Sequence, residues 1–131
     1  MEEENIALVR TALTALGRRD VELYLTVASP KIELISPASA LEGPSLGHEG
    51  VRRFFEEAKT FTESSNVEIE EIRAVGPRVL ALFRVTAVGR ASGAETSIDL
   101  GGVYSFEDGK IRRAEIFADR EAALEAAGVP T

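Results

Sequence analysis

The sequence has no cysteine and no tryptophan, and it contains a single methionine and a single histidine. The absence of cysteine excludes disulfide bonds, thiolate metal ligands and a cysteine nucleophile. No apolar run approaches the ~20 residues that a membrane-spanning helix needs, so no membrane partner is expected. Basic side chains are outnumbered, 15 against 22 acidic ones, and the resulting net charge of −7 disfavours a nucleic acid as partner.

Motifs for nucleophilic catalysis and for phosphate binding are also missing. No serine lies in a nucleophile motif and no glycine-rich phosphate loop is present, so no cofactor is expected. The one histidine, His48, has no neighbouring acidic cluster and predicts no metal site. Its position at the start of a predicted helix favours a surface or capping role.

What is present fits one folded domain. The 131 residues are 44% hydrophobic and 28% charged, and no repeat or linker divides them, so a single domain over 1–131 is predicted. Three glutamates follow Met1, the opposite of a basic signal-peptide start. The expected compartment is therefore the cytoplasm.

Hydrophobic residues recur at helical spacing in several segments. Spacings of three and four residues predict helices over 3–17 and 48–61. A shorter helix is predicted to start after an Asp20 N-cap and to stop at Ser29-Pro30, because the residue before proline avoids the helical conformation. A closing helix is predicted over 120–127.

A period of two predicts one early strand and four later strands. Short glycine-containing turns join the later four, which indicates an antiparallel meander. Helices that are segregated from an antiparallel sheet make this an α+β fold, and the segment 37–47 is expected to be a loop. The predicted strands cover 31–36, 67–75, 78–90, 95–106 and 110–118.

Two irregularities in the strand pattern carry further expectations. Segment 79–88 is apolar at both alternate sets of positions, which is typical of a strand covered on both faces. Since the helices cover one face of the sheet, we expect the outer face to form a homodimer. In 67–75 the alternation slips by one residue, which predicts a β-bulge. The bulge could turn Glu70 or Glu71 into a pocket, or leave both on a wet edge.

Four motifs at caps and turns follow one another in a specific order: Gly-His-Glu-Gly-Val-Arg-Arg-Phe at 47–54, Arg-Ala-Ser-Gly at 90–93, Asp-Gly-Lys-Ile at 108–111, and the segment 119–128. Their order and spacing resemble the SnoaL-like branch of the nuclear transport factor 2-like superfamily. The resemblance implies a cone-shaped, cystatin-like fold, in which a curved antiparallel sheet wraps around three N-terminal helices and a short C-terminal helix follows. Members include polyketide cyclases, ketosteroid isomerases, dehydratases, limonene epoxide hydrolases and non-catalytic binding domains, so the fold does not fix the function.

The catalytic members of this group use carboxylates inside the cone, where an apolar setting tunes the pKa. The resemblance places the essential aspartate of the cyclases and epoxide hydrolases at Ile116, and the oxyanion-stabilising aspartate of the isomerases near Gly102. The epoxide hydrolase sequence Arg-Val-Asp is similar to Arg84-Val85-Thr86, with threonine in place of the acid. These replacements argue against each of the three mechanisms.

Three polar side chains remain as candidates for a non-standard catalytic set. Arg84 would either hold an anionic or carbonyl group of a ligand or pair with a nearby glutamate. Glu71, if turned inward beside Arg84, would be a general base. Tyr104 lies on the core-facing side of its strand, where its hydroxyl needs a partner or a ligand.

These observations predict a protein that binds a small apolar or amphipathic molecule in a mostly apolar pocket. One alternative is a cofactor-free isomerase, cyclase or hydrolase that uses Glu71, Arg84 and Tyr104, and another is a dimerisation domain with a filled cone. The residues predicted to line the pocket are Tyr24, Phe54, Phe55, Leu82, Arg84, Thr86, Gly102, Tyr104 and Ile116.

Overall fold

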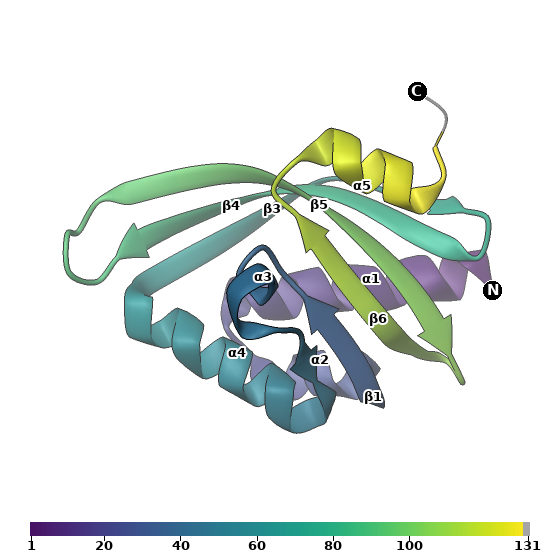
Figure 1. The fold of residues 1–131 in the computed structure, drawn as a ribbon, viewed down its shortest axis with the longest axis horizontal. Helices are drawn as coiled ribbons and strands as arrows, with labels where there is room; N and C mark the ends of the chain where they lie inside the picture. Colours follow the sequence, from purple (N-terminus) through teal and green to yellow (C-terminus); the bar gives the residue numbers. More distant parts are fainter. Residues whose placement is uncertain (130–131) are drawn as a thin grey trace.

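The computed structural model describes residues 1–129, which form one six-stranded sheet and a set of helices (Figure 1). The helices are α1 (Glu2–Arg18), α2 (Val21–Val27), α3 (Ser39–Glu42), α4 (Gly47–Phe61) and α5 (Arg120–Ala127). The strands are β1 (Ala28–Ile35), β2 (Ser45–Leu46), β3 (Thr62–Val75), β4 (Arg78–Gly89), β5 (Glu95–Glu107) and β6 (Lys110–Phe117).

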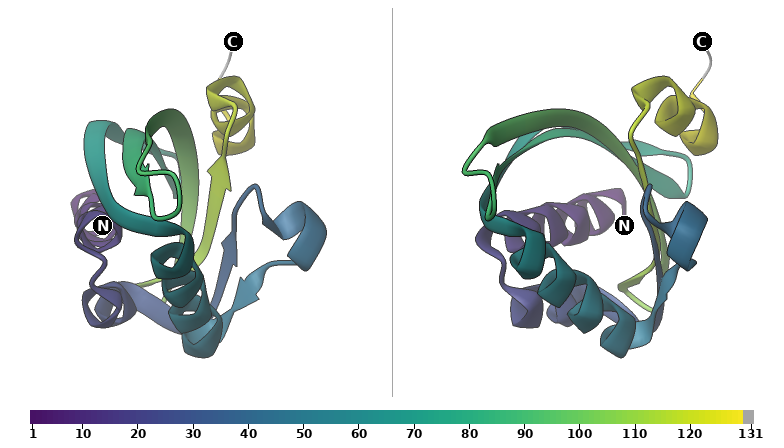
Figure 2. Two further views of the ribbon diagram at one scale, coloured as in Figure 1. Left: turned by 90° about the vertical axis from the view of Figure 1, so that its left-hand side faces the viewer. Right: turned by 60° about the vertical axis from the view of Figure 1, so that its left-hand side comes forward.

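The sheet has the strand order β2-β1-β6-β5-β4-β3, so β2 and β3 are its two edges. All neighbours are antiparallel except β1 and β6, which run parallel. Figure 2 shows the sheet bent into an arch, with α1, α2 and α4 under its concave side and α5 on its convex side. We call these the inner and outer faces of the sheet. The α+β class and the curved sheet around helices are confirmed.

The alternation of β4 explains both layers of the core. On the inner face, Val79, Ala81 and Phe83 are at most 1% exposed and belong to one cluster with residues of α1 and α2. On the outer face, Leu80 is fully buried in a second cluster with Ala123 of α5. Burial of both faces stabilises the strand through the apolar area that is removed from water.

The outer cluster accounts for apolar residues on which the expected homodimer was based. The apolar residues on the second face of β4 were expected to meet another subunit, but α5 covers Leu80 together with Val103. Beyond α5 the same face carries exposed polar pairs such as Arg84 with Asp99. A homodimer through this face stays a prediction, and polar side chains would have to supply much of the contact.

Three element boundaries differ from expectation. The segment 37–47, predicted to be a loop, holds α3 and β2. β1 begins at Ala28 rather than at 31, and β3 begins at Thr62 rather than at 67. Residues 62–66 contain no hydrophobic side chain, so no alternation marks them, yet they pair with residues 86–89 of β4.

None of the helices in residues 1–129 is long and apolar enough to cross a lipid bilayer.

Candidate functional site

A cavity of about 250 Å³ lies between the inner face of the sheet and the ends of α1 and α4. Its wall is largely apolar, with aromatic rings from α4 and aliphatic side chains from four strands. An apolar hollow with a small number of polar groups is the usual form of a small-molecule site. The lining residues are Leu16, Arg19, Ser36, Pro37, Phe54, Phe55, Ala58, Thr62, Ser65, Val67, Phe83, Val85, Ala87, Leu100 and Ile116.

Strand alternation builds the apolar wall. Phe83, Val85 and Ala87 occupy successive inner positions of β4, because side chains two residues apart share a face. Opposite them, Phe54 and Phe55 of α4 stack edge to face, with ring centroids 6.2 Å apart. Most of the wall is therefore held by helices and strands, while Ser36 and Pro37 come from the turn after β1.

Arg19 is the one ionisable side chain among these lining residues. Its Nε donates a hydrogen bond to Ser65 Oγ at 3.2 Å, and its Nη1 donates one to the Thr62 carbonyl at 3.0 Å. Nη2 donates to the Thr62 hydroxyl. None of the ion pairs within residues 1–129 involves Arg19. The half-buried guanidinium thus has neutral partners and no carboxylate.

The backbone of Arg19 is unusual as well. It follows α1 with φ 58° and ψ 34°, the left-handed conformation. Its N–H donates to the Leu16 carbonyl, and the N–H of Asp20 donates to the Ala15 carbonyl. Glycine is the residue most often found at this position of a helix end, since a Cβ atom disfavours it. The sequence pattern predicted that this helix ends at Gly17. The direction of the Arg19 side chain could not be predicted, because a residue beyond the end of a helix is not part of its periodic pattern.

Three of the predicted lining residues lie in the cavity wall: Phe54, Phe55 and Ile116. Tyr24 and Tyr104 lie in the inner core instead, each 1% exposed. Burial raises the pKa of both phenols, and for Tyr104 the proximity of Tyr24 adds to the rise. Both hydroxyls remain neutral across the physiological range and face no cavity.

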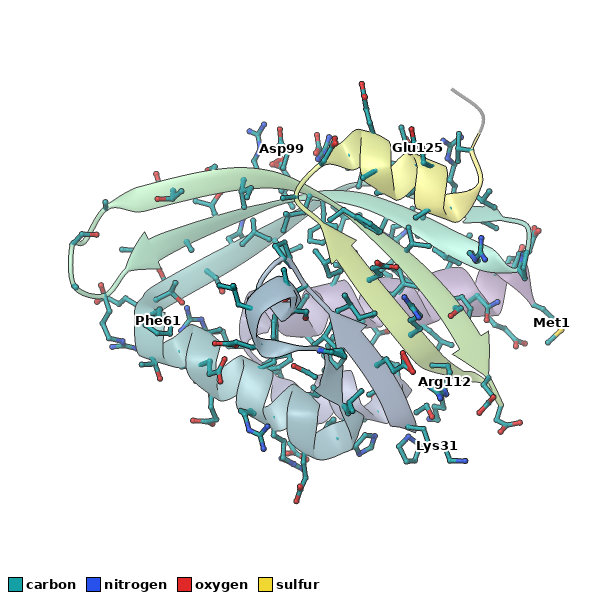
Figure 3. The ribbon with its side chains drawn as sticks, in the orientation of Figure 1. Met1, Lys31, Phe61, Asp99, Arg112 and Glu125 are labelled. Atoms are coloured by element: carbon teal, nitrogen blue, oxygen red, sulfur yellow. The ribbon has the colours of Figure 1, made fainter. Side chains whose placement is uncertain are left out.

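The expectation that Arg84 points into the cone is wrong. It stands opposite Asp99 on the outer face, with Nε and Oδ1 2.7 Å apart. Figure 3 shows Asp99 on the same side of the sheet as α5. The hydrogen bond to Asp99 raises the pKa of Arg84, and the same bond lowers the pKa of Asp99. The sequence left open an ion pair with a nearby glutamate as the alternative for Arg84, and the observed partner is Asp99 instead.

Thr86 and Leu82 share the outer face with Arg84, since all three alternate together, so neither lines the cavity. The Thr86 hydroxyl lies 2.9 Å from the Ser97 hydroxyl, and Leu82 packs against the outer cluster with α5. Gly102 is on the inner face, but the ring of Tyr104 fills the space beside it. A Cβ atom on Gly102 would lie 2.9 Å from the Tyr104 hydroxyl oxygen.

The β-bulge predicted in β3 is confirmed between Ile69 and Glu71, but it turns no acid inward. Glu71 pairs with Arg73 at 2.9 Å, and Glu70 pairs with Arg120. Glu71, Arg84 and Tyr104 therefore do not converge on one site.

His48 has a structural contact, with its Nε2 2.9 Å from the carbonyl oxygen of Ala28. This contact joins the start of α4 to the start of β1. Within residues 1–129 no group of three or more histidine, aspartate or glutamate side chains is placed to hold a metal ion.

Comparison with known proteins identifies a matching protein family and solved structures of similar fold. A family model described as SnoaL-like domain matches residues 9–114. No curated protein sequence matches the chain.

Solved structures of the same fold cover nearly the whole chain. An NTF2-like protein of unknown function from Burkholderia pseudomallei K96243 has a TM-score of 0.79 and 22% identity, over 95% of this chain and 98% of that one. TerC, co-crystallised with polyporic acid, has a TM-score of 0.79 and 23% identity over the same shares. A cystatin-fold protein from Novosphingobium aromaticivorans has a TM-score of 0.74 and 24% identity, over 89% and 98%. These likenesses confirm the expected cone-shaped fold.

Proposed function

The chain belongs to the SnoaL-like domain family, and from that premise we propose that its cavity binds a small, mostly apolar molecule. The observation that carries the proposal is the apolar hollow of about 250 Å³ with one cationic side chain in its wall. Transfer of an apolar ligand from water into such a wall is favourable in proportion to the area buried. Co-crystallisation of TerC with polyporic acid is consistent with this use of the fold.

The proposal is binding rather than proton transfer, because the candidate catalytic groups lie apart. Glu71 and Arg84 form ion pairs on the outer face, and Tyr104 is in the core. Ile116 occupies the cavity wall where the resemblance implies an aspartate. A general acid or base must come within hydrogen-bond reach of the reacting group, and no carboxylate is among the lining residues. The hollow itself opposes the alternative of a filled dimerisation cone.

The test is a fluorescence titration with N-phenyl-1-naphthylamine, a neutral probe that brightens in apolar surroundings. We expect saturable binding to the wild-type chain. Ala87→Phe places a ring inside the cavity and is expected to weaken binding by about tenfold or more, equivalent to about 1.4 kcal/mol of lost contact. The measurement is the dissociation constant of each variant.

Ala91→Phe is the matched control, because it adds the same ring at an exposed turn position outside the cavity. It is expected to bind the probe like the wild type. Absence of saturable binding to the wild type, or equal binding by both variants, would overturn the proposed function.

A further inference from the structure

We infer that the cavity selects apolar molecules that end in a carboxylate or an equivalent planar oxyanion, and that Arg19 is the residue that binds this anionic end. The inference rests on the proposed function and adds the chemical class of ligand to it. Four properties of Arg19 carry it: its unused donors, its neutral hydrogen-bond partners, its backbone conformation and its place in the cavity.

The first property is donor capacity. A guanidinium group has five N–H donors in a rigid fork. Arg19 directs three of its hydrogen bonds to Ser65 Oγ, the Thr62 carbonyl and the Thr62 hydroxyl. The other two N–H groups, one on each terminal nitrogen, take part in none of these bonds. Each of these two groups can donate a charge-assisted hydrogen bond to an oxygen of an anionic ligand.

The second property is charge. A cation at an apolar, partly buried wall is costly unless an opposite charge or several hydrogen bonds compensate it. All three acceptors of Arg19 are neutral, whereas six other arginines of the described chain pair with carboxylates. An anionic ligand would supply the missing counter-charge in a setting of lower dielectric constant. The paired arginines are Arg52, Arg73, Arg84, Arg112, Arg113 and Arg120.

The third property is the left-handed backbone of Arg19, with φ 58°. A glycine would adopt this helix end with less strain, yet the position holds a long cationic side chain. The conformation carries the side chain away from the end of α1 and toward Thr62 and Ser65, which line the cavity beside it. Strained backbone positions cluster at active sites and ligand contacts.

The fourth property is the polarity gradient of the cavity. Arg19, Thr62 and Ser65 form a polar end, while Phe83 and Ile116 belong to the apolar wall. A ligand with one anionic end and an apolar body matches both parts at once. The volume of about 250 Å³ is below the range of roughly 300–1,000 Å³ common for drug-sized ligands. A fused two-ring acid is therefore a suitable probe.

Arg19 also has a structural contact that the test must separate from ligand binding. Its bond to the Thr62 carbonyl lies just beyond the C-terminal end of α4, where a cation is favourable for the helix dipole. Arg90 shares this contact: its Nη2 donates to the same carbonyl at 3.3 Å and its Nε donates to the Lys59 carbonyl at 3.0 Å. Arg90 does not line the cavity, which makes it the matched control.

The experiment compares 2-naphthoate with its neutral isostere 2-naphthamide by isothermal titration calorimetry. The wild type is expected to bind 2-naphthoate about tenfold or more tightly, since hydrogen bonds to a charged group are stronger than neutral ones. Arg19→Gln is expected to abolish this preference, so that the dissociation constants of the two probes agree within about twofold. Arg90→Gln is expected to keep the wild-type preference. Far-UV circular dichroism checks that each variant is folded.

The outcomes separate the two proposals. If the wild type binds both probes equally, or if Arg19→Gln keeps the preference, the inference fails and the apolar binding function stands. If Arg90→Gln loses the preference to the same extent as Arg19→Gln, general positive potential is responsible and the inference also fails. If neither naphthyl probe binds while N-phenyl-1-naphthylamine does, only the inference about anionic ligands fails. If none of the three probes binds, both proposals fail.

A second variant keeps the test decisive if Arg19→Gln does not fold. Arg19→Lys retains the charge and loses the planar fork, so it is expected to retain a smaller preference for 2-naphthoate. A wild-type preference that is unchanged in Arg19→Lys would overturn the role of the guanidinium donors. The preference of the wild type is measured without any variant, so the selectivity itself is always tested.

Discussion

At the scale of single residues, Tyr24 and Tyr104 show how burial in the core changes the pKa of a titratable group. They are the two tyrosines of the sequence, and each is 1% exposed. Burial penalises the phenolate and raises both pKa values above the ordinary value of 10.0. The folded state therefore keeps both protons under conditions where the unfolded chain begins to release them.

This difference predicts a loss of stability in alkali. Below pH 10 neither state has ionised, so the contribution is fully present, and above pH 10 the unfolded state releases protons first and becomes favoured. We expect the phenolate absorbance to rise only together with the loss of far-UV circular dichroism. Tyr24→Phe should halve the absorbance change and shift unfolding to higher pH. Ionisation near pH 10 in a folded chain would contradict the prediction.

Arg84 is the residue whose surroundings differ most from expectation, and it supplies a second residue-scale prediction. Its partner is Asp99, and both side chains are about half exposed, at 48% and 47%. Arg84→Ala is expected to leave the affinity for N-phenyl-1-naphthylamine within about twofold, since Arg84 does not reach the cavity. A marked loss of affinity would place Arg84 back in the site.

The same variant has an electrostatic consequence that nuclear magnetic resonance can follow. Arg84 lowers the pKa of Asp99 through their hydrogen bond, so Arg84→Ala should raise that pKa toward its ordinary value of 3.8. In the wild type the pair supports folding above that value, and its support is lost as the pH falls through the lowered pKa. An Asp99 titration unchanged by the substitution would contradict the pairing.

At the scale of elements, the docking of α5 depends on a glycine in β5. A Cβ atom on Gly101 would lie 2.5 Å from the Cβ of Ala123 in α5, closer than atoms can approach. Gly101→Ala is therefore expected to push α5 away from the sheet and to destabilise the protein by about 1–3 kcal/mol. The measurement is the free energy of unfolding in urea.

A double-mutant cycle separates this collision from other effects of the substitution. Ala123→Gly removes the opposing methyl group and alone is expected to cost about 1 kcal/mol through helix propensity. The combined variant should be more stable than the sum of the two single losses, because the clash is gone. Additive losses would show that close approach of α5 is not the reason for Gly101.

Element boundaries were predictable where local chemistry marks them. Turns at Gly76-Pro77, at Gly93 and at Asp108-Gly109 divide β3 to β6, and the predicted ends of β4, β5 and β6 agree with the structure within one residue. The start of β3 was not predictable, because its polar residues 62–66 gain strand structure only from pairing with β4. The short elements α3 and β2 were missed because Leu41 and Leu46 remain exposed, at 94% and 61%.

At the scale of the whole molecule, the candidate site was only partly predictable. Phe54, Phe55 and Ile116 lie on helix and strand faces that pattern alone can orient. The pattern could not show which side chains of β4 face the cavity. Its outer positions Leu80 and Leu82 are as apolar as its inner ones, because they pack against α5. Arg19 lies at a helix end, where its direction follows from tertiary packing and from one backbone angle.

The position of β3 at the edge of the sheet has a consequence for self-association of the folded chain. An edge strand offers free backbone donors and acceptors on which another chain can add a strand, the step that begins fibre growth. Along its 14 residues β3 carries exposed carboxylates at Glu63, Glu68, Glu70 and Glu71. Two such edges would bring like charges together in a molecule that already has a net charge of −7. Colloidal solubility should therefore decline as the pH is lowered toward the isoelectric point, where the net charge vanishes.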